Sequence, residues 1–276
     1  MLCGEPNSRS LRSHVLMAGR SRKQRKLDLK AVEAFVNKNI DAFHTERVKS
    51  LQQKTLHELL KAKNPYLFRA KNLLVAQEFV EEVLSAHISS SEERAFGGFL
   101  EDLAIFVSEM TRGARKSGIQ GIDLEFEDGP KHYLVSVKSG PKWGNSRQQR
   151  DQARDFETAV RIIKQSKLSK TVEPILGICY GKTRTTFVRS ATKIVGQNFW
   201  YLISGSETIY KDIIEPLGYE AKKHNEAFVK ARAAAINLLT KEFTEDFCVN
   251  GSIDWSKVVE FNSGNLKNPD PSGPGA

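Results

Sequence analysis

The sequence predicts an α/β protein with a mixed central β-sheet flanked by helices and with an N-terminal helical region. Apolar residues recur at helical spacing before residue 111, whereas residues 122–138 alternate between apolar and polar as a β-hairpin does. Residues 174–180 form a short, nearly all-apolar run, which indicates a strand buried on both faces. Because helical and strand segments succeed one another along the chain, we expect a mixed sheet.

Several helices are expected before the hairpin. Helical periodicity runs from Leu27 to about Lys63, where Asn64 and Pro65 interrupt it, and a second helix should cover residues 70–87. Serines at 89–91 form a helix-start signal, because a Ser side chain can accept hydrogen bonds from the first free amides. The helix that they begin should reach about Thr111.

The second half of the chain supplies the strands. Residues 122–127 and 132–138 should pair as a hairpin around the turn at 128–130. A helix is expected from residue 146 to about 167, followed by strands at 174–180 and near 185–188, and another strand at 199–203. Further helices are expected near 208–215 and 221–241.

Composition and charge restrict the class of protein. The chain has 276 residues, and its 42 Lys and Arg exceed its 33 Asp and Glu, which gives a net charge of +9. Excess positive charge favours a polyanionic partner, although a basic protein without a nucleic-acid partner would have the same composition. The three cysteines are far apart, which argues against a disulfide framework or a zinc site. Without a secretory signal or an apolar membrane span, we expect a soluble, cytoplasmic protein.

The hairpin carries the residues that could perform chemistry. If Glu127 pairs with His132, then Asp123 faces Ser136, and Lys138 lies two residues along the same face. A carboxylate can bind Mg²⁺, and a nearby ammonium group can orient a water and stabilise negative charge, as phosphodiester hydrolysis requires. A register shift of one residue would place these side chains on opposite faces of the sheet. In the alternative interpretation the hairpin faces solvent, and Asp123 and Lys138 are only the polar residues of its alternating pattern.

A series of sequence blocks resembles the PD-(D/E)xK restriction endonucleases of the PmeII kind. In order along residues 60–263, these blocks are 64–68, 99–101, 121–123, 136–141, 143–145, 176–182, 196–200 and 253–255. The resemblance implies a restriction-endonuclease-like fold and a Mg²⁺-dependent homodimer. It also implies cleavage of both strands of double-stranded DNA at a short, near-palindromic sequence, which leaves 5′-phosphate ends. A two-fold symmetric dimer matches such a target.

The chain departs from this motif at one position. The motif has an Asp or Glu two residues before the Lys, where this chain has Ser136. A second acidic metal ligand must therefore come from elsewhere, and Glu101 is preferred because it lies among small residues on an otherwise buried helix. The remaining candidates are Glu125, Asp151, Asp155 and Glu157. We therefore expect Asp123, Ser136, Lys138 and Glu101 to form the catalytic site, with Asp123 and Glu101 as metal ligands.

Basic and polar residues beyond the hairpin are candidates for DNA binding. They are Lys142, Asn145, Arg147, Arg150, Arg154, Lys182 and Arg184. The three arginines follow one face of the helix after the hairpin, although such a stripe is often only a solvated surface. Trp143 either lies at the edge of the DNA groove or closes a loop over the core. Residues 177–183 have the wrong spacing for a nucleotide-binding loop, so no NTP is expected.

The predicted organisation has four parts. Residues 1–27 form a basic flexible arm, residues 28–88 a helical region for dimerisation or DNA binding, residues 89–261 the PD-(D/E)xK nuclease core with C-terminal helices, and residues 262–276 a loose tail. Two alternatives to a restriction enzyme remain. One is a repair or branched-DNA nuclease with the same core, and the other is a DNA-binding protein that has lost catalysis.

Overall fold

The computed structural model describes residues 25–166, 170–219 and 221–265. The predicted arm, except for residues 25–27, and the tail beyond residue 265 lie outside these residues. The chain forms two compact units. Unit 1 comprises the residues up to Lys38 together with Gly97–Gly218, and unit 2 comprises Asn39–Phe96 together with the residues from Tyr219 onward.

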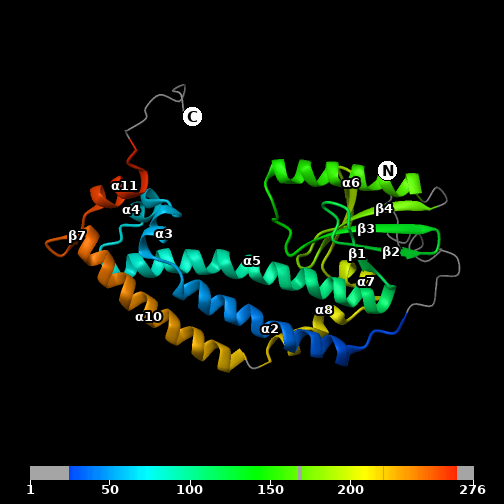
Figure 1. Ribbon diagram of the computed structural model, residues 1–276, viewed down its shortest axis with the longest axis horizontal. Coiled ribbons are helices and arrows are strands. Elements are labelled where there is room, and N and C mark those ends of the chain that lie inside the picture. Colours follow the sequence, from blue (N-terminus) through cyan, green and yellow to red (C-terminus); the bar gives the residue numbers. More distant parts are fainter. Residues whose placement is uncertain (1–24, 167–169, 220, 266–276) are drawn as a thin grey trace, which may run out of the picture. The chain divides into compact units, whose positions relative to one another are not determined.

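Unit 1 contains the central sheet, and the predicted α/β class is confirmed (Figure 1). The described residues form a six-stranded mixed sheet in the order β1-β2-β3-β4-β6-β5, in which β3, β4 and β6 are parallel and the other neighbours are antiparallel. Its strands are β1 (Arg115–Lys116), β2 (Leu124–Asp128), β3 (Lys131–Lys138), β4 (Thr171–Ile178), β5 (Thr186–Val188) and β6 (Ala191–Val195).

The expected hairpin register is confirmed. Glu127 pairs with His132 and Leu124 with Val135, so the two strands meet without a bulge between these pairs. The turn is tight because Gly129 takes φ +56°, a conformation that residues with a side chain rarely adopt. This register fixes which side chains of β2 and β3 share a face of the sheet.

Helices cover both faces of the sheet in unit 1 (Figure 1). The helices of unit 1 include the C-terminal part of α5 (Ala76–Arg112), α6 (Ser146–Ser166), α7 (Gln197–Ser204), α8 (Ile209–Asp212) and α9 (Ile214–Leu217). Leu176 and Ile178 of β4 pack with α6 in a shared core cluster. Gly177, between them, faces the other way, where a Cβ would lie 2.2 Å from the Phe199 ring of α7. Gly177 therefore allows β4 and α7 to pack closely.

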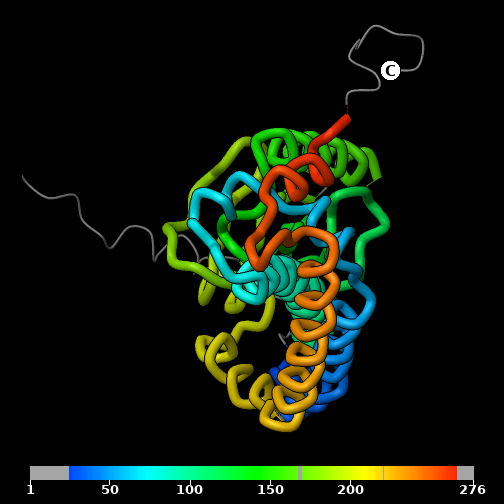
Figure 2. Tube along the Cα trace, turned by 90° about the vertical axis from the view of Figure 1, so that its left-hand side faces the viewer, coloured from blue at the N-terminus to red at the C-terminus, as the bar shows by residue number. Residues whose placement is uncertain are grey.

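Unit 2 is helical around its own apolar core. It contains α3 (Leu56–Lys61), α4 (Pro65–Ala70), α10 (Ala221–Phe247), the short pair β7 (Cys248–Val249) and β8 (Ser252–Ile253), and α11 (Trp255–Ser263). The N-terminal part of α5 lies beside α10 (Figure 2). There Phe79 stacks on Phe243, with ring centroids 4.6 Å apart. Helix α2 (Leu29–Gln52), like α5, contributes residues to both units.

Two sequence predictions of secondary structure are wrong. No helix begins at Ser89–Ser91, because α5 runs through them without a break; Ser90 Oγ instead donates to the carbonyl of Ala86 four residues earlier. Residues 199–203 form a helix rather than a strand. The apolar residues of this segment are buried on one side of a helix. A short apolar run is compatible with either a buried helix or a buried strand, so the sequence alone does not separate the two. Within the described residues, no helix is both long and apolar enough to cross a membrane.

Candidate active site

Asp123 lies immediately before β2, opposite Ser136 in the hairpin register. Its amide donates to the Val135 carbonyl at 2.9 Å. Its carboxylate oxygen Oδ2 accepts hydrogen bonds from the Val137 amide at 2.6 Å and from Ser136 Oγ at 3.2 Å. The carboxylate is therefore held in one orientation by β3 while its side chain remains 20% exposed.

Lys138, the last residue of β3, lies beside this carboxylate. Its Nζ is 3.9 Å from Asp123 Oδ2, and its side chain is 26% exposed. The Nζ also lies 5.7 Å from the ring centroid of Trp143, an attractive arrangement of a cation over an aromatic face. Trp143 also packs against the core cluster that includes α6, so one side chain contacts both the core and the ammonium group of Lys138.

Ser136 is fully buried and connects the site to α6. Its hydroxyl lies 3.1 Å from Gln152 Oε1 as well as 3.2 Å from Asp123 Oδ2. The amide group of Gln152 donates to the Gly121 carbonyl at 2.8 Å, just before Asp123. Gln152 belongs to the site but is not predicted from the sequence. The signal was its place on the apolar stripe of α6, where it shares one buried face with Phe156, Ala159 and Ile163.

Glu101 approaches from α5. One turn earlier on that helix, a Cβ on Gly97 would lie 3.4 Å from Ser139 Oγ, so the helix passes close to the end of β3. Glu101 is half-buried, and its pKa is raised by burial first and by the negative charge of Asp123 second, with the charge of Lys138 opposing. The structure thus brings Glu101, Asp123 and Lys138 within electrostatic reach of one another.

Comparison with known protein families matches residues 30–225 to the Type II restriction endonuclease EcoO109I. The chain belongs to this family. The matched segment covers most of the chain and includes Asp123, Ser136, Lys138 and Glu101. A search of curated proteins finds no match. The narrower resemblance to PmeII remains a prediction.

Membership of the EcoO109I family makes the chain a restriction endonuclease, a nuclease that binds DNA, and such enzymes generally use a divalent metal ion. The side chains of the site fit such an ion. Asp123 and Glu101 offer carboxylate oxygens, the ligands that Mg²⁺ prefers. Two carboxylates at close range repel each other when both are ionised, and a cation between them would offset that repulsion.

The other candidate acids have different surroundings. Glu125 is buried, with a hydrogen bond to His132 at 2.8 Å and an ion pair with Arg115 at 3.1 Å. On α6, Asp151 pairs with two arginines of the basic stripe, Glu157 is exposed, and Asp155 packs against Gly121. The pKa of Glu101, by contrast, is raised in part by the negative charge of Asp123. These contacts favour Glu101 as the second acidic ligand.

The residues suggested for DNA binding lie mostly at the surface of unit 1. Exposed residues are Lys142, Asn145, Arg147, Arg150, Arg154, Lys182 and Arg184. Asn145 has a local structural role, because its side-chain oxygen caps α6 by accepting from the amides of Arg147 and Gln148, both at 3.0 Å. Arg147 and Arg154 both approach Asp151, at 4.0 and 3.3 Å, whereas the structure shows no ion pair for Arg150 among the described residues.

Proposed function

We propose that this restriction endonuclease cuts both strands of double-stranded DNA at a short, near-palindromic sequence, that it requires Mg²⁺, and that it acts as a homodimer. The observation that carries the proposal is the approach of Lys138 Nζ to within 3.9 Å of Asp123 Oδ2 at the ends of adjacent strands. Two further features argue against a merely solvent-facing hairpin. Ser136 is buried beside Asp123, and Glu101 of α5 lies close enough for the charge of Asp123 to raise its pKa.

Each residue has a distinct proposed role. Asp123 and Glu101 would hold the ion, and a Mg²⁺ bound there would supply Lewis-acid polarisation of the scissile phosphate and a lowered pKa of the attacking water. Lys138 donates hydrogen bonds to the attacking water and to the phosphate oxygens, where negative charge develops. Ser136 takes the place of the motif's acid and, with Gln152, fixes the carboxylate of Asp123. Trp143 limits the movement of the Lys138 ammonium group.

The surface of unit 1 suits a DNA backbone. Arg147, Arg150 and Arg154 lie along one side of α6, and Lys182 and Arg184 lie in the exposed segment after β4. Each phosphate that such a residue neutralises releases condensed counterions, which favours binding without specifying sequence. We propose that these residues hold the duplex while the strand ends present Asp123 and Lys138 to one phosphate.

The test is cleavage of plasmid DNA by purified Asp123→Asn and Lys138→Ala proteins. Each should lower the cleavage rate at least about a thousandfold, because metal and charge stabilisation supply several kcal/mol to the transition state. Both should still fold and bind DNA, measured by circular dichroism and by gel shift without divalent metal. Asp151→Asn changes a partly exposed acid on α6; it is the matched control and should cut normally.

The products decide among the remaining alternatives. Wild-type protein with Mg²⁺ should give discrete bands whose sequenced ends share one recognition site. A smear, or products from branched DNA alone, would indicate a different nuclease. Full cleavage by purified Asp123→Asn protein would show that the site has been assigned wrongly.

A further inference from the structure

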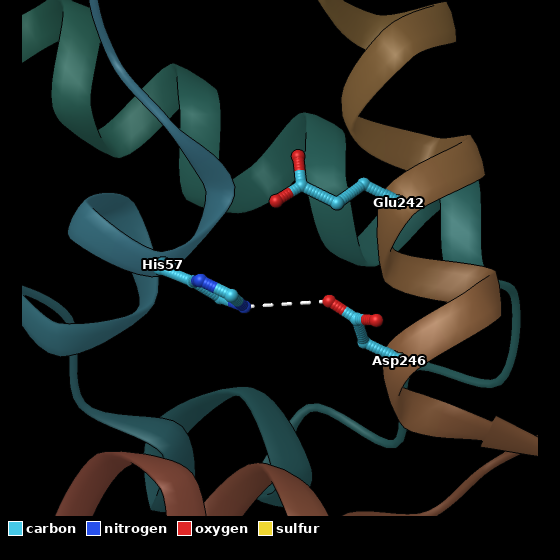
Figure 3. A group of neighbouring side chains, drawn as sticks. All are labelled: His57, Glu242 and Asp246. Carbon is cyan, nitrogen blue, oxygen red and sulfur yellow. Dashed lines mark ion pairs between the residues drawn. The ribbon is translucent and has the colours of Figure 1, made fainter.

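Unit 2 contains a second group of metal-ligating side chains. His57 lies on α3, and Glu242 and Asp246 lie one turn apart on α10 (Figure 3). One ligand atom from each residue lies within 4.8 Å of the other two. None of the three takes part in the proposed cleavage site, which lies in unit 1.

The imidazole of His57 is held in place by its surroundings. Helix α3 begins with a capping box, in which Thr55 and Glu58 each accept a hydrogen bond from the other's amide, so the turn that bears His57 is well defined. The imidazole ring packs on Phe261, with centroids 4.7 Å apart, and meets Phe247 edge-on at 6.3 Å. In this position Nε2 points toward α10 (Figure 3).

The separation of the His57 and Asp246 ligand atoms fits a metal ion. His57 Nε2 lies 3.3 Å from Asp246 Oδ2, longer than the roughly 2.7–2.9 Å of a strong charge-assisted hydrogen bond. Two ligands at about 2.0–2.1 Å from a tetrahedral Zn²⁺ lie about 3.3 Å apart. Figure 3 shows the Glu242 carboxylate extending from α10 toward the same space.

The charges in this group also point to a cation. Glu242 and Asp246 are separated by four residues on one helix face, where like charges destabilise each other. In the part of the chain that the structure describes, neither forms an ion pair with a lysine or arginine, although the chain has 42 of these residues. Glu245, on the same helix, does pair with Lys241 at 3.9 Å.

We propose that His57, Glu242 and Asp246 bind one first-row transition metal ion, with Zn²⁺ as the best match. An imidazole with two carboxylates suits Zn²⁺, whereas Mg²⁺ prefers ligand sets made of oxygen alone. The ion would join α3 to α10 and stabilise unit 2, because it binds the folded arrangement of the two helices and not the unfolded chain. This role is independent of DNA cleavage.

The test is titration of untagged full-length protein with ZnCl₂ by calorimetry, together with thermal unfolding. The double variant Asp123→Asn/Glu101→Gln serves as the background, so that zinc at the cleavage site does not contribute. We expect one Zn²⁺ per chain, and a Tm rise of about 3 °C at an ion concentration about ten times Kd. Adding His57→Gln, or Asp246→Asn, to that background should remove both signals.

Matched controls separate this site from nonspecific zinc binding. Glu245→Gln changes an exposed acid on the same helix outside the group and should leave both zinc signals intact. His57→Gln alone should cut plasmid at the wild-type rate with Mg²⁺. If the background protein shows no zinc-dependent rise in Tm, or if His57→Gln does not diminish it, the proposed zinc site is wrong, whatever the outcome of the cleavage tests.

Discussion

The carboxylate of Asp123 has an asymmetric environment that suits a metal ligand. Val137, Ser136 and Lys138 all contact its Oδ2, and within the described residues no hydrogen bond to its Oδ1 is formed. One oxygen therefore fixes the orientation of the group while the other remains for a cation. Glu101 differs, because its raised pKa reflects burial and the charge of Asp123, both of which disfavour its ionised form.

Glu101 should therefore determine how tightly the enzyme holds its metal. We expect Glu101→Gln to raise the Mg²⁺ concentration for half-maximal cleavage at least about tenfold, the factor that corresponds to 1.4 kcal/mol of lost binding. Glutamine keeps the size of the side chain but removes the negative charge that the cation needs. The measurement is the cleavage rate of a fixed plasmid substrate across a Mg²⁺ titration.

Asp151→Asn provides the comparison for Glu101→Gln. Asp151 is another candidate for the second acidic metal ligand from the sequence, but its carboxylate pairs with arginines on α6. Its Mg²⁺ dependence should match that of the wild type. A larger effect from Asp151→Asn than from Glu101→Gln would move the second acidic ligand from α5 to α6.

The sequence predicts individual site residues where a local pattern dictates geometry. Strand alternation and the turn position are enough to place Asp123 opposite Ser136 and near Lys138. Gln152 could not be assigned in this way, since its contacts with Ser136 and Gly121 depend on how α6 packs on the sheet. The same holds for the cation–π contact between Lys138 and Trp143, which depends on the path of the loop.

At the scale of elements, α5 shows where local signals fail. The serines at 89–91 resemble a helix start, yet their hydroxyls form other hydrogen bonds. Ser90 Oγ donates to the Ala86 carbonyl of the same helix, and Ser91 Oγ accepts from Ser50 Oγ of α2. A 37-residue helix results, and it brings Glu101 to the sheet although the residues before Gly97 belong to unit 2. Tertiary packing, which single-sequence patterns do not contain, outweighs the capping preference here.

Helix α6 should contribute to DNA affinity mainly through Arg150. Arg154 and Arg147 approach Asp151, so removing either also frees an acid, whereas Arg150 has no ion pair among the described residues. We expect Arg150→Ala to reduce the slope of log K against log salt by about 0.9, the contribution of one phosphate contact on B-DNA. Fluorescence anisotropy with a labelled duplex, without divalent metal, measures this slope.

The control for Arg150 is Arg232→Ala, which removes an equal charge from α10 in unit 2. The net charge of both variants falls by the same amount, so a general effect of charge would change both slopes alike. Equal slopes for wild-type and Arg150→Ala protein would remove α6 from the proposed DNA surface.

At the scale of the whole molecule, the described residues of each chain contain one pairing of Asp123 with Lys138. Duplex DNA has two antiparallel strands, and their scissile phosphates are related by a two-fold axis in a palindromic site. One chain would have to release and rebind to cut both strands. A two-fold symmetric homodimer of the 31.0 kDa chain would present one such pair to each strand at once.

A homodimer with one catalytic site per strand predicts the product of a mixed dimer. Wild-type chains with one affinity tag and Asp123→Asn chains with another are co-expressed, and the mixed species is purified through both tags. With the dimer in excess over plasmid, the wild-type homodimer should give linear DNA, whereas the mixed dimer should give nicked circles as its main product, because only one strand meets an intact Asp123. Failure to recover a mixed species, or linear DNA formed from it as fast as from the wild type, would contradict a dimer with one catalytic site per strand. Gel electrophoresis of the reaction over time separates the two outcomes directly.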